Sequence, residues 1–230
     1  MSSPAAAQMQ APIWRDPWAC AIGAIAAAVF VVAGAGGPTW LDSGELIAAA
    51  RELGGIHPPG HPAWLSIAAA VEWLPFGPQA ARLAWLSALA AGVSVALVVR
   101  IARLVLGPAG WTATGSMWSG AAGLSLLASG SLWAVATRAE VYTLTLATGL
   151  WSLDAALRAG NSCGSDGKPT ATTAPALAEV AVAIALGLTN HHYITLFTLP
   201  ALVVAGWPAL RPLVRTHRRL LAALVGAAAA

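Results

Sequence analysis

Long apolar segments separated by short polar ones run through most of the chain. Since a membrane-spanning helix needs about 20 largely apolar residues, we expect spans at residues 18–37, 83–99, 111–137, 141–157, 177–189 and 193–210. Residues 220–230 begin a further apolar segment, but at about 1.5 Å per residue they reach only about half of a ~30 Å hydrocarbon core. We therefore expect an all-α, polytopic membrane helix bundle of about seven transmembrane helices, with the sequence truncated in the last one.

The composition supports a lipid environment. Hydrophobic residues make up 58% of the chain and charged residues 9%, with a mean hydropathy of +0.71. A soluble domain has about 25% charged residues, so this chain cannot cover a water-facing surface. The net charge of +3 would also suit a nucleic-acid binder. The basic residues lie between the apolar segments instead, as membrane orientation requires, so we expect the lipid bilayer as a partner and no nucleic acid.

The basic residues also predict the topology. With residues 1–17 as a cytoplasmic tail and 159–176 as a cytoplasmic loop, most of them fall on the cytoplasmic side, as the positive-inside rule demands. They are Arg15, Arg100, Arg103, Arg158, Lys168, Arg211, Arg215, Arg218 and Arg219. Residues 38–82 then form a large first outer loop, in which 63–74 is too short for a span and is interpreted as an interfacial helix. If 63–74 were counted as a span, every later loop would change sides. The basic cluster at residues 211–219 would then lie outside.

An acidic motif, Asp42-Ser43-Gly44-Glu45, follows the first predicted span. On a helix that begins there, Asp42 and Glu45 lie on one face, so both carboxylates could point into a shared site. The same spacing is also that of an N-terminal capping box, in which Asp42 accepts a backbone N–H and Glu45 reaches back. The motif alone leaves both interpretations open.

The hexapeptide His57-Pro58-Pro59-Gly60-His61-Pro62 is the most distinctive motif in the chain. Its prolines and glycine predict a stiff, non-helical turn from which two histidines project. The histidines could contact an anion such as a phosphate, or could simply be polar residues at the interface. A divalent metal is a further alternative, for which the spacing supplies no third ligand.

Two other polar motifs fall on the same predicted outer face. Arg138-Ala139-Glu140 lies between the third and fourth spans, and Asn190-His191-His192 lies between the fifth and sixth. Each could be a local feature of its turn. An ionisable residue near membrane depth is costly in free energy, however, and usually faces a polar cavity or a partner. Four segments with carboxylates, imidazoles or an arginine on one face together predict a shared outward-facing pocket.

These motifs resemble those of the bacterial relatives of protein O-mannosyltransferases, within the GT-C glycosyltransferase superfamily. The resemblance covers residues 18–210 and includes Arg-Ala-Glu-Val-Tyr and Gly-Leu-x-Asn-His. It implies a GT-C-type transmembrane module at residues 18–230, in the bacterial inner (plasma) membrane. The partners implied are a polyprenyl-phosphate-linked sugar donor and a protein or glycan acceptor.

The resemblance also implies roles for individual residues. Asp42 would be the base that deprotonates the acceptor hydroxyl, with Glu45 and Glu140 orienting Asp42 or the acceptor. For chemical reasons we expect His57, His61 and Arg138 to hold the departing phosphate, and Asn190 and His191 to lie with them in the substrate site. No cofactor is implied with certainty, and a divalent metal stays open. The alternative functions are a transporter or flippase for a lipid-linked substrate and an inactive truncated scaffold.

Overall fold

The computed structural model describes residues 4–39, 42–164 and 168–216. Within these ranges every regular element is a helix, which confirms the all-α prediction. The elements are α1 (Pro4–Gln10), the 3-10 helix η1 (Ile13–Arg15), α2 (Pro17–Ala33), α3 (Ser43–Glu52), α4 (Pro62–Val71), α5 (Gln79–Val105), the 3-10 helix η2 (Gly107–Trp111), α6 (Ala113–Leu127), α7 (Gly130–Ala136), α8 (Tyr142–Asn161) and α9 (Thr173–Thr216).

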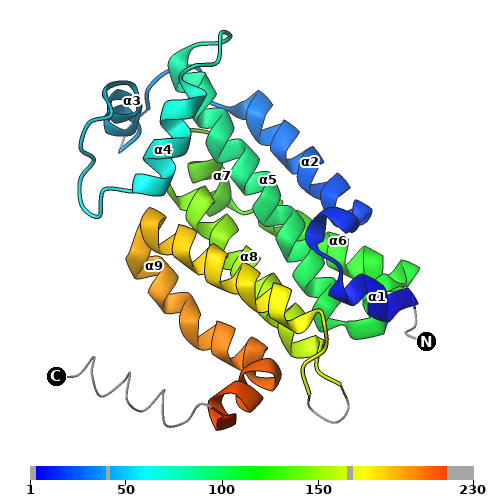
Figure 1. Cartoon of the computed structure of the whole chain (residues 1–230). Helices are drawn as coiled ribbons and strands as arrows, with labels where there is room; N and C mark the ends of the chain where they lie inside the picture. The colour runs from blue at the N-terminus through cyan, green and yellow to red at the C-terminus, as the bar shows by residue number, and fades with distance from the viewer. Residues whose placement is uncertain (1–3, 40–41, 165–167, 217–230) are drawn as a thin grey trace, which may run out of the picture.

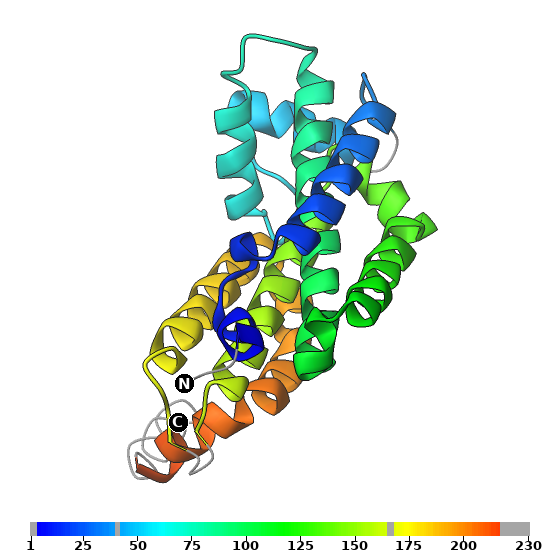
Figure 2. The same ribbon diagram turned by 90° about the vertical axis from the view of Figure 1, so that its right-hand side faces the viewer.

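Helix α5 is the centre of the bundle, and α2, α6 and α8 pack around it (Figures 1 and 2). Small residues let α2 approach α5 closely. A Cβ atom added at Gly92 would lie 2.6 Å from the Ala27 Cβ and 2.7 Å from the Gly23 carbonyl oxygen. Such close crossings of small residues are typical of helices that pack within membranes.

By length and composition, two described helices could cross a membrane, α5 and the long α9, or three if α6 and α7 form one bent span. Helices α2 and α4 are apolar but shorter. The 17 residues of α2 extend about 25 Å, a little less than the ~30 Å hydrocarbon core. The chain is therefore a helical protein with membrane-spanning candidates, and the prediction of about seven spans is not confirmed.

The predicted span 111–137 is not one continuous helix. It begins with η2 and is broken between α6 and α7, whose axes differ by 63°. Ser129 has extended backbone angles and precedes Gly130, so the helix cannot continue there. The Trp133 indole N–H donates to the Leu127 carbonyl at 2.7 Å, which satisfies an acceptor at the end of α6.

Helix α9 contains a sharp kink at His191, whose φ and ψ are −150° and 87°. The two halves run in opposite directions beside α8 (Figure 1), and a Cβ atom at Gly187 would lie 2.7 Å from the Thr195 hydroxyl. The halves contain the predicted segments 177–189 and 193–210, with the kink at the predicted turn. The two segments are therefore helical, as expected.

Three of the arginines predicted for the cytoplasmic side are not loop residues. Arg100, Arg103 and Arg158 are buried within α5 and α8. Their buried guanidiniums are balanced by carboxylates within 4 Å, as burial of charge requires. We call this set the arginine–carboxylate cluster; its members are Asp16, Arg100, Arg103, Asp154, Arg158 and Glu179.

The predicted N-terminal tail also has structure. Within residues 1–17, α1 and η1 are helical, and Arg100 donates hydrogen bonds to the carbonyl oxygens of Gln8 and Ala11. Figures 1 and 2 place α1 at the opposite end of the bundle from α3 and α4. We call the end of the bundle that holds α3 and α4 the α3–α4 end.

The predicted interfacial helix 63–74 corresponds to α4, which is too short to span a membrane. The predicted first outer loop 38–82 contains both α3 and α4. The predicted basic residues Arg218 and Arg219, and the seventh span at 220–230, lie outside the described residues.

Candidate functional site at the α3–α4 end

The acidic motif opens α3 but does not form a capping box. Asp42 is the N-cap residue, and its side chain makes no capping hydrogen bond. Glu45 does not reach back to it; its Oε1 accepts from the His57 backbone N–H and its Oε2 meets His57 Nδ1, both at 2.7 Å. The two carboxylates therefore face the histidine turn, which favours the shared-site interpretation of the motif.

His57 lies between the two carboxylates. Its Nε2 is 3.9 Å from Asp42 Oδ2, while Nδ1 bonds Glu45. The hydrogen bond to Glu45, reinforced by the charges of Glu45 and Asp42, raises the pKa of His57 above its ordinary value of 6.5. The same bond lowers the pKa of Glu45. Among the histidines whose pKa is shifted by their surroundings, His57 is thus the most readily protonated.

His61 ends the turn and precedes α4, where Pro62 takes the first helical position. Its φ of 45° and ψ of 50° lie in the left-handed region, which few residues other than glycine adopt. Its ring is buried, and Nδ1 lies 2.6 Å from the Asn190 carbonyl oxygen. A carbonyl only accepts, so Nδ1 carries the proton. Burial lowers the pKa of His61, which favours the neutral ring.

Glu140 is almost fully buried in the connection between α7 and α8. Burial raises the pKa of its carboxyl, against the opposing effect of Arg138, whose Nε lies 3.1 Å from Oε1. The Ser87 hydroxyl of α5 donates to the Glu140 carbonyl and accepts from its backbone N–H. Ser87 therefore fixes the backbone at Glu140, a role that the sequence analysis missed.

The kink in α9 brings Asn190 and His191 to the same place. The Asn190 side-chain amide donates to the Val141 carbonyl at 3.0 Å and to the Thr145 hydroxyl at 2.7 Å. The His191 ring lies 5.4 Å from the His61 ring and 5.8 Å from the Tyr142 ring, between ring centres. Because the backbone is non-helical at His191, its ring turns towards these neighbours rather than continuing the helix face.

All eight predicted site residues therefore belong to one connected set. Contacts lead from Asp42 and Glu45 through the two histidines of the turn to α9, and from α9 through Val141 to the Arg138–Glu140 pair. The members are Asp42, Glu45, His57, His61, Arg138, Glu140, Asn190 and His191. We call this set the polar cluster. It joins four segments that are far apart in the sequence, as the sequence analysis expected.

Asp42, Glu45 and His57 offer ligand atoms that lie within 4.8 Å of one another, the one such group found in the part of the chain that the structure describes. Two carboxylates and an imidazole suit divalent metals of borderline hardness. His57 Nδ1 already bonds Glu45, so a metal between Asp42 and His57 would use Nε2, with Glu45 fixing the ring from behind. The residues present thus fit a metal ion without requiring one.

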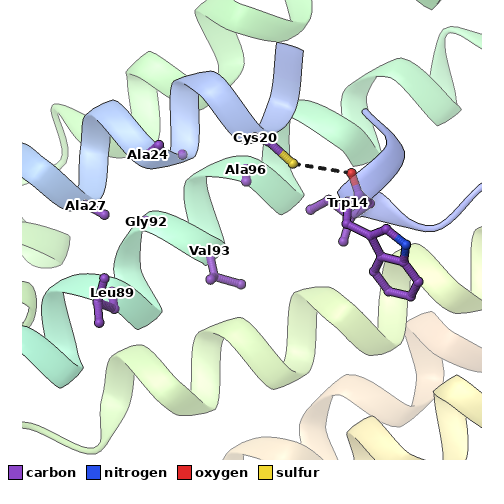
Figure 3. A pocket seen from close by; sticks show the side chains of 10 residues that line it. Trp14, Cys20, Ala24, Ala27, Leu89, Gly92, Val93 and Ala96 are labelled. Carbon is purple, nitrogen blue, oxygen red and sulfur yellow. Dashed lines mark hydrogen bonds between the residues drawn. The ribbon is translucent and has the colours of Figure 1, made fainter. Parts of the chain in front are cut away.

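Two apolar grooves lie along α5. Figure 3 shows the first, of about 340 Å³, between α2 and α5, where Trp14 and Cys20 lie at one end and Leu89 at the other. The second, of about 370 Å³, lies between α5, α8 and α9 and reaches from Trp14 to Leu86. Leu86 packs against the buried cluster that includes Ala139 and Val141, the residues on either side of Glu140. The second groove therefore runs from the region of η1 to the edge of the polar cluster.

The structure is a helical bundle with membrane-spanning candidates, with carboxylates, imidazoles and an arginine gathered at one end. A family model described as "Protein O-mannosyl-transferase TMEM260 N-terminal domain" matches residues 42–207, well over half of the 230 residues, and the chain belongs to this family. The match begins at Asp42 and supports the resemblance to protein O-mannosyltransferases. No solved structure matches the chain.

Proposed function

We propose that this protein is a glycosyltransferase that moves a sugar, mannose by family resemblance, from a polyprenyl-phosphate donor to an acceptor hydroxyl of a protein or glycan. Family membership indicates the transferase class. The observation that carries the proposal is the polar cluster, because it joins a carboxylate that could accept a proton to cationic groups that could hold a phosphate.

The chemistry is a single displacement with inversion at the anomeric carbon. Asp42 takes the proton of the acceptor hydroxyl as the acceptor oxygen forms its bond to that carbon. A free hydroxyl is a poor nucleophile, and a positioned base typically contributes 10²–10⁴-fold. The bond from the anomeric carbon to the phosphate oxygen breaks, and its electron pair leaves with the polyprenyl phosphate. Glu45 and Glu140 orient the reacting groups.

The leaving phosphate needs positive charge or hydrogen-bond donors as it departs. His57 supplies a cation, since Glu45 raises its pKa and favours the imidazolium. Arg138 supplies a guanidinium that stays charged at any physiological pH. His61 offers a ring nitrogen rather than a charge, because burial lowers its pKa. A divalent metal held by Asp42 and a neutral His57 would supply positive charge at the same place instead of the imidazolium.

The donor's polyprenyl chain requires an apolar path beside the site. The second groove, which reaches Leu86 at the edge of the polar cluster, has suitable chemistry and position. We expect the polar cluster to face the periplasm or exterior of a bacterial inner membrane, with the N-terminus in the cytoplasm, by the positive-inside rule applied to the exposed Arg15, Arg211 and Arg215. The donor sugar would then be presented on the outer leaflet.

The first test compares sugar transfer by membranes that contain the wild type or the Asp42→Asn variant. The assay uses radiolabelled polyprenyl-phosphate mannose and a membrane extract as the acceptor source. We expect Asp42→Asn to reduce transfer by about 10²-fold or more at equal expression, since it removes the base. The matched control is Glu52→Gln, which removes an exposed carboxylate from the other end of α3.

The outcomes are distinct. Transfer that survives Asp42→Asn would retain the transferase and contradict the assignment of the base. No transfer by the wild type with any lipid-linked sugar, together with movement of such a lipid across the bilayer of reconstituted vesicles, would favour the flippase alternative.

A further inference from the structure

We propose that Tyr142 and Tyr193, together with the free oxygens of Glu140 and Asn190, form the subsite that holds the sugar ring of the donor. This inference rests on the proposed function and names residues that the sequence analysis did not assign to it. The ligand class is a saturated ring that carries several hydroxyl groups, rather than a phosphate or a planar base.

Two separate motifs each supply a buried hydrogen-bond acceptor and an exposed tyrosine ring. Glu140 is followed two residues later by Tyr142, and Asn190 is followed three residues later by Tyr193. Each motif therefore brings one almost fully buried acceptor and one exposed phenol ring to the same region, where both rings lie next to His191. This arrangement is not explained by packing, because both tyrosine rings remain exposed.

The rings form a continuous apolar wall. The Tyr142 and Tyr193 ring centres lie 5.8 and 6.5 Å from that of His191, which itself lies 5.4 Å from His61. Tyr142 is 40% exposed and Tyr193 is 61% exposed. An aromatic residue with an apolar face and a polar hydroxyl suits a ligand that has both apolar C–H faces and hydroxyl groups.

The same two motifs carry two buried acceptors without partners. Glu140 Oε2 and Asn190 Oδ1 are buried and have no hydrogen-bond partner among the described residues. The orientation of the Asn190 amide is fixed, because its nitrogen must donate to the Val141 carbonyl. A buried acceptor without a partner costs about 1–3 kcal/mol. The Asn190 oxygen, and Glu140 in the ionised form that Arg138 favours, can only accept, so they suit a ligand with O–H groups.

The same chemistry separates the sugar from the phosphate. A carboxylate such as Glu140 repels an anion but forms strong hydrogen bonds with hydroxyl groups. The phosphate therefore belongs with His57 and with the guanidinium of Arg138, which pairs with Glu140 and so lies at the boundary between the two subsites. His61, whose ring contacts both His57 and His191, joins the phosphate side to the sugar side. The sugar subsite and the phosphate subsite are thus adjacent, as a sugar phosphate requires.

The test measures binding of two lipids to the purified full-length chain in detergent by calorimetry. The probes are polyprenyl-phosphate mannose and polyprenyl phosphate without a sugar. In the wild type we expect the mannose-bearing lipid to bind about tenfold more tightly, which corresponds to about 1.4 kcal/mol from the ring contacts and new hydrogen bonds together. Tyr142→Ala and Tyr193→Ala should each reduce this ratio severalfold while leaving the affinity for polyprenyl phosphate unchanged.

Two controls keep the result interpretable. Tyr142→Phe and Tyr193→Phe retain the ring and should retain most of the ratio, whereas Tyr193→Leu retains apolar bulk without a ring and should lose it. The melting temperature of each variant verifies folding, which exposed positions rarely disturb. Equal binding of both lipids by the wild type, or an unchanged ratio in the alanine variants, would overturn the subsite.

Binding does not require turnover, so the two proposals can fail separately. A wild type that prefers the mannose-bearing lipid but transfers no sugar would contradict the proposed function and leave the subsite standing. A wild type that transfers mannose, with alanine variants whose KM for the donor is unchanged, would contradict the subsite alone.

Discussion

His57 and Glu45 illustrate how an exposed pair can control charge at a reaction site. Glu45 contacts both the backbone and the ring of His57, so its removal affects the position and the protonation of the imidazole together. The interaction raises the pKa of His57, and the imidazolium is therefore complete below the ordinary value of 6.5 and is lost as the pH rises through the raised value.

We predict that Glu45→Gln shifts the pH dependence of phosphate binding. In the wild type, the affinity for polyprenyl phosphate should be high at low pH and fall as the pH rises through the raised pKa of His57. In Glu45→Gln the same fall should occur at lower pH, because the carboxylate that favours the imidazolium is gone. Calorimetric titration with polyprenyl phosphate between pH 5 and pH 9 measures this, with Glu52→Gln as the control. Superimposable profiles would show that His57 does not hold the phosphate.

At the scale of single residues, the sequence indicated which polar residues lie together but not which contacts they make. The eight members of the polar cluster could be named because charge is rare in apolar segments and its motifs are conspicuous. The choice between a capping box and a shared site at Asp42 could not be made, because both use the same spacing. Ser87 escaped notice because a serine inside an apolar helix has no distinctive pattern.

At the scale of elements, the close crossing of α2 and α5 depends on glycine. A Cβ atom at Gly92 would lie 2.6 Å from the Ala27 Cβ, within the range where something must move. At Gly149, inside α8, the nearest atom to such a Cβ is the Thr198 methyl group at 3.6 Å, an ordinary contact. Both glycines lie inside helices, but only Gly149 has room for a Cβ atom.

We predict opposite effects for the same substitution at these two positions. Gly92→Ala should lower stability by about 1–3 kcal/mol, the usual cost of overpacking. Gly149→Ala should be neutral or raise stability by up to about 1 kcal/mol, since alanine favours a helix over glycine. Thermal unfolding in detergent, followed by circular dichroism, compares them. A Gly92→Ala variant as stable as Gly149→Ala would mean that α2 and α5 do not approach as described.

Element boundaries were harder to predict than element type. Apolar composition identified the helical segments, including the two halves of α9 on either side of His191. The break between α6 and α7 was missed because Ser129 and Gly130 are both common in membrane helices. Their effect depends on Trp133, which bonds the Leu127 carbonyl and packs against Phe30 at 5.1 Å between ring centres.

At the scale of the whole molecule, the arginine–carboxylate cluster joins elements from every part of the bundle. Asp16 precedes α2, Arg100 belongs to α5, Asp154 to α8 and Glu179 to α9. The positive-inside rule interprets such arginines as loop residues, because it counts charges along the chain and ignores pairing. Only the packing shows that carboxylates neutralise them, so the sequence could not predict this cluster.

We predict that breaking this cluster destabilises the whole bundle. Asp154 is fully buried and pairs with Arg158 at 2.8 Å and with Arg100 at 3.6 Å. Asp154→Asn would leave both guanidiniums short of a counter-charge, at a cost of about 3 kcal/mol. The exposed control Glu52→Gln should change stability by less than about 0.5 kcal/mol. Equal melting temperatures for the two variants would show that the pairing contributes nothing measurable.

The hydrogen bond between His61 and the Asn190 carbonyl joins residues that are 129 positions apart. Chains are synthesised at about 5–20 residues per second, so about 6 to 26 seconds pass between the emergence of these two residues. During that interval the histidine turn and α4 have no partner carbonyl to close on. The polar cluster is therefore complete only after Asn190 has been synthesised, well after the histidine turn and α4.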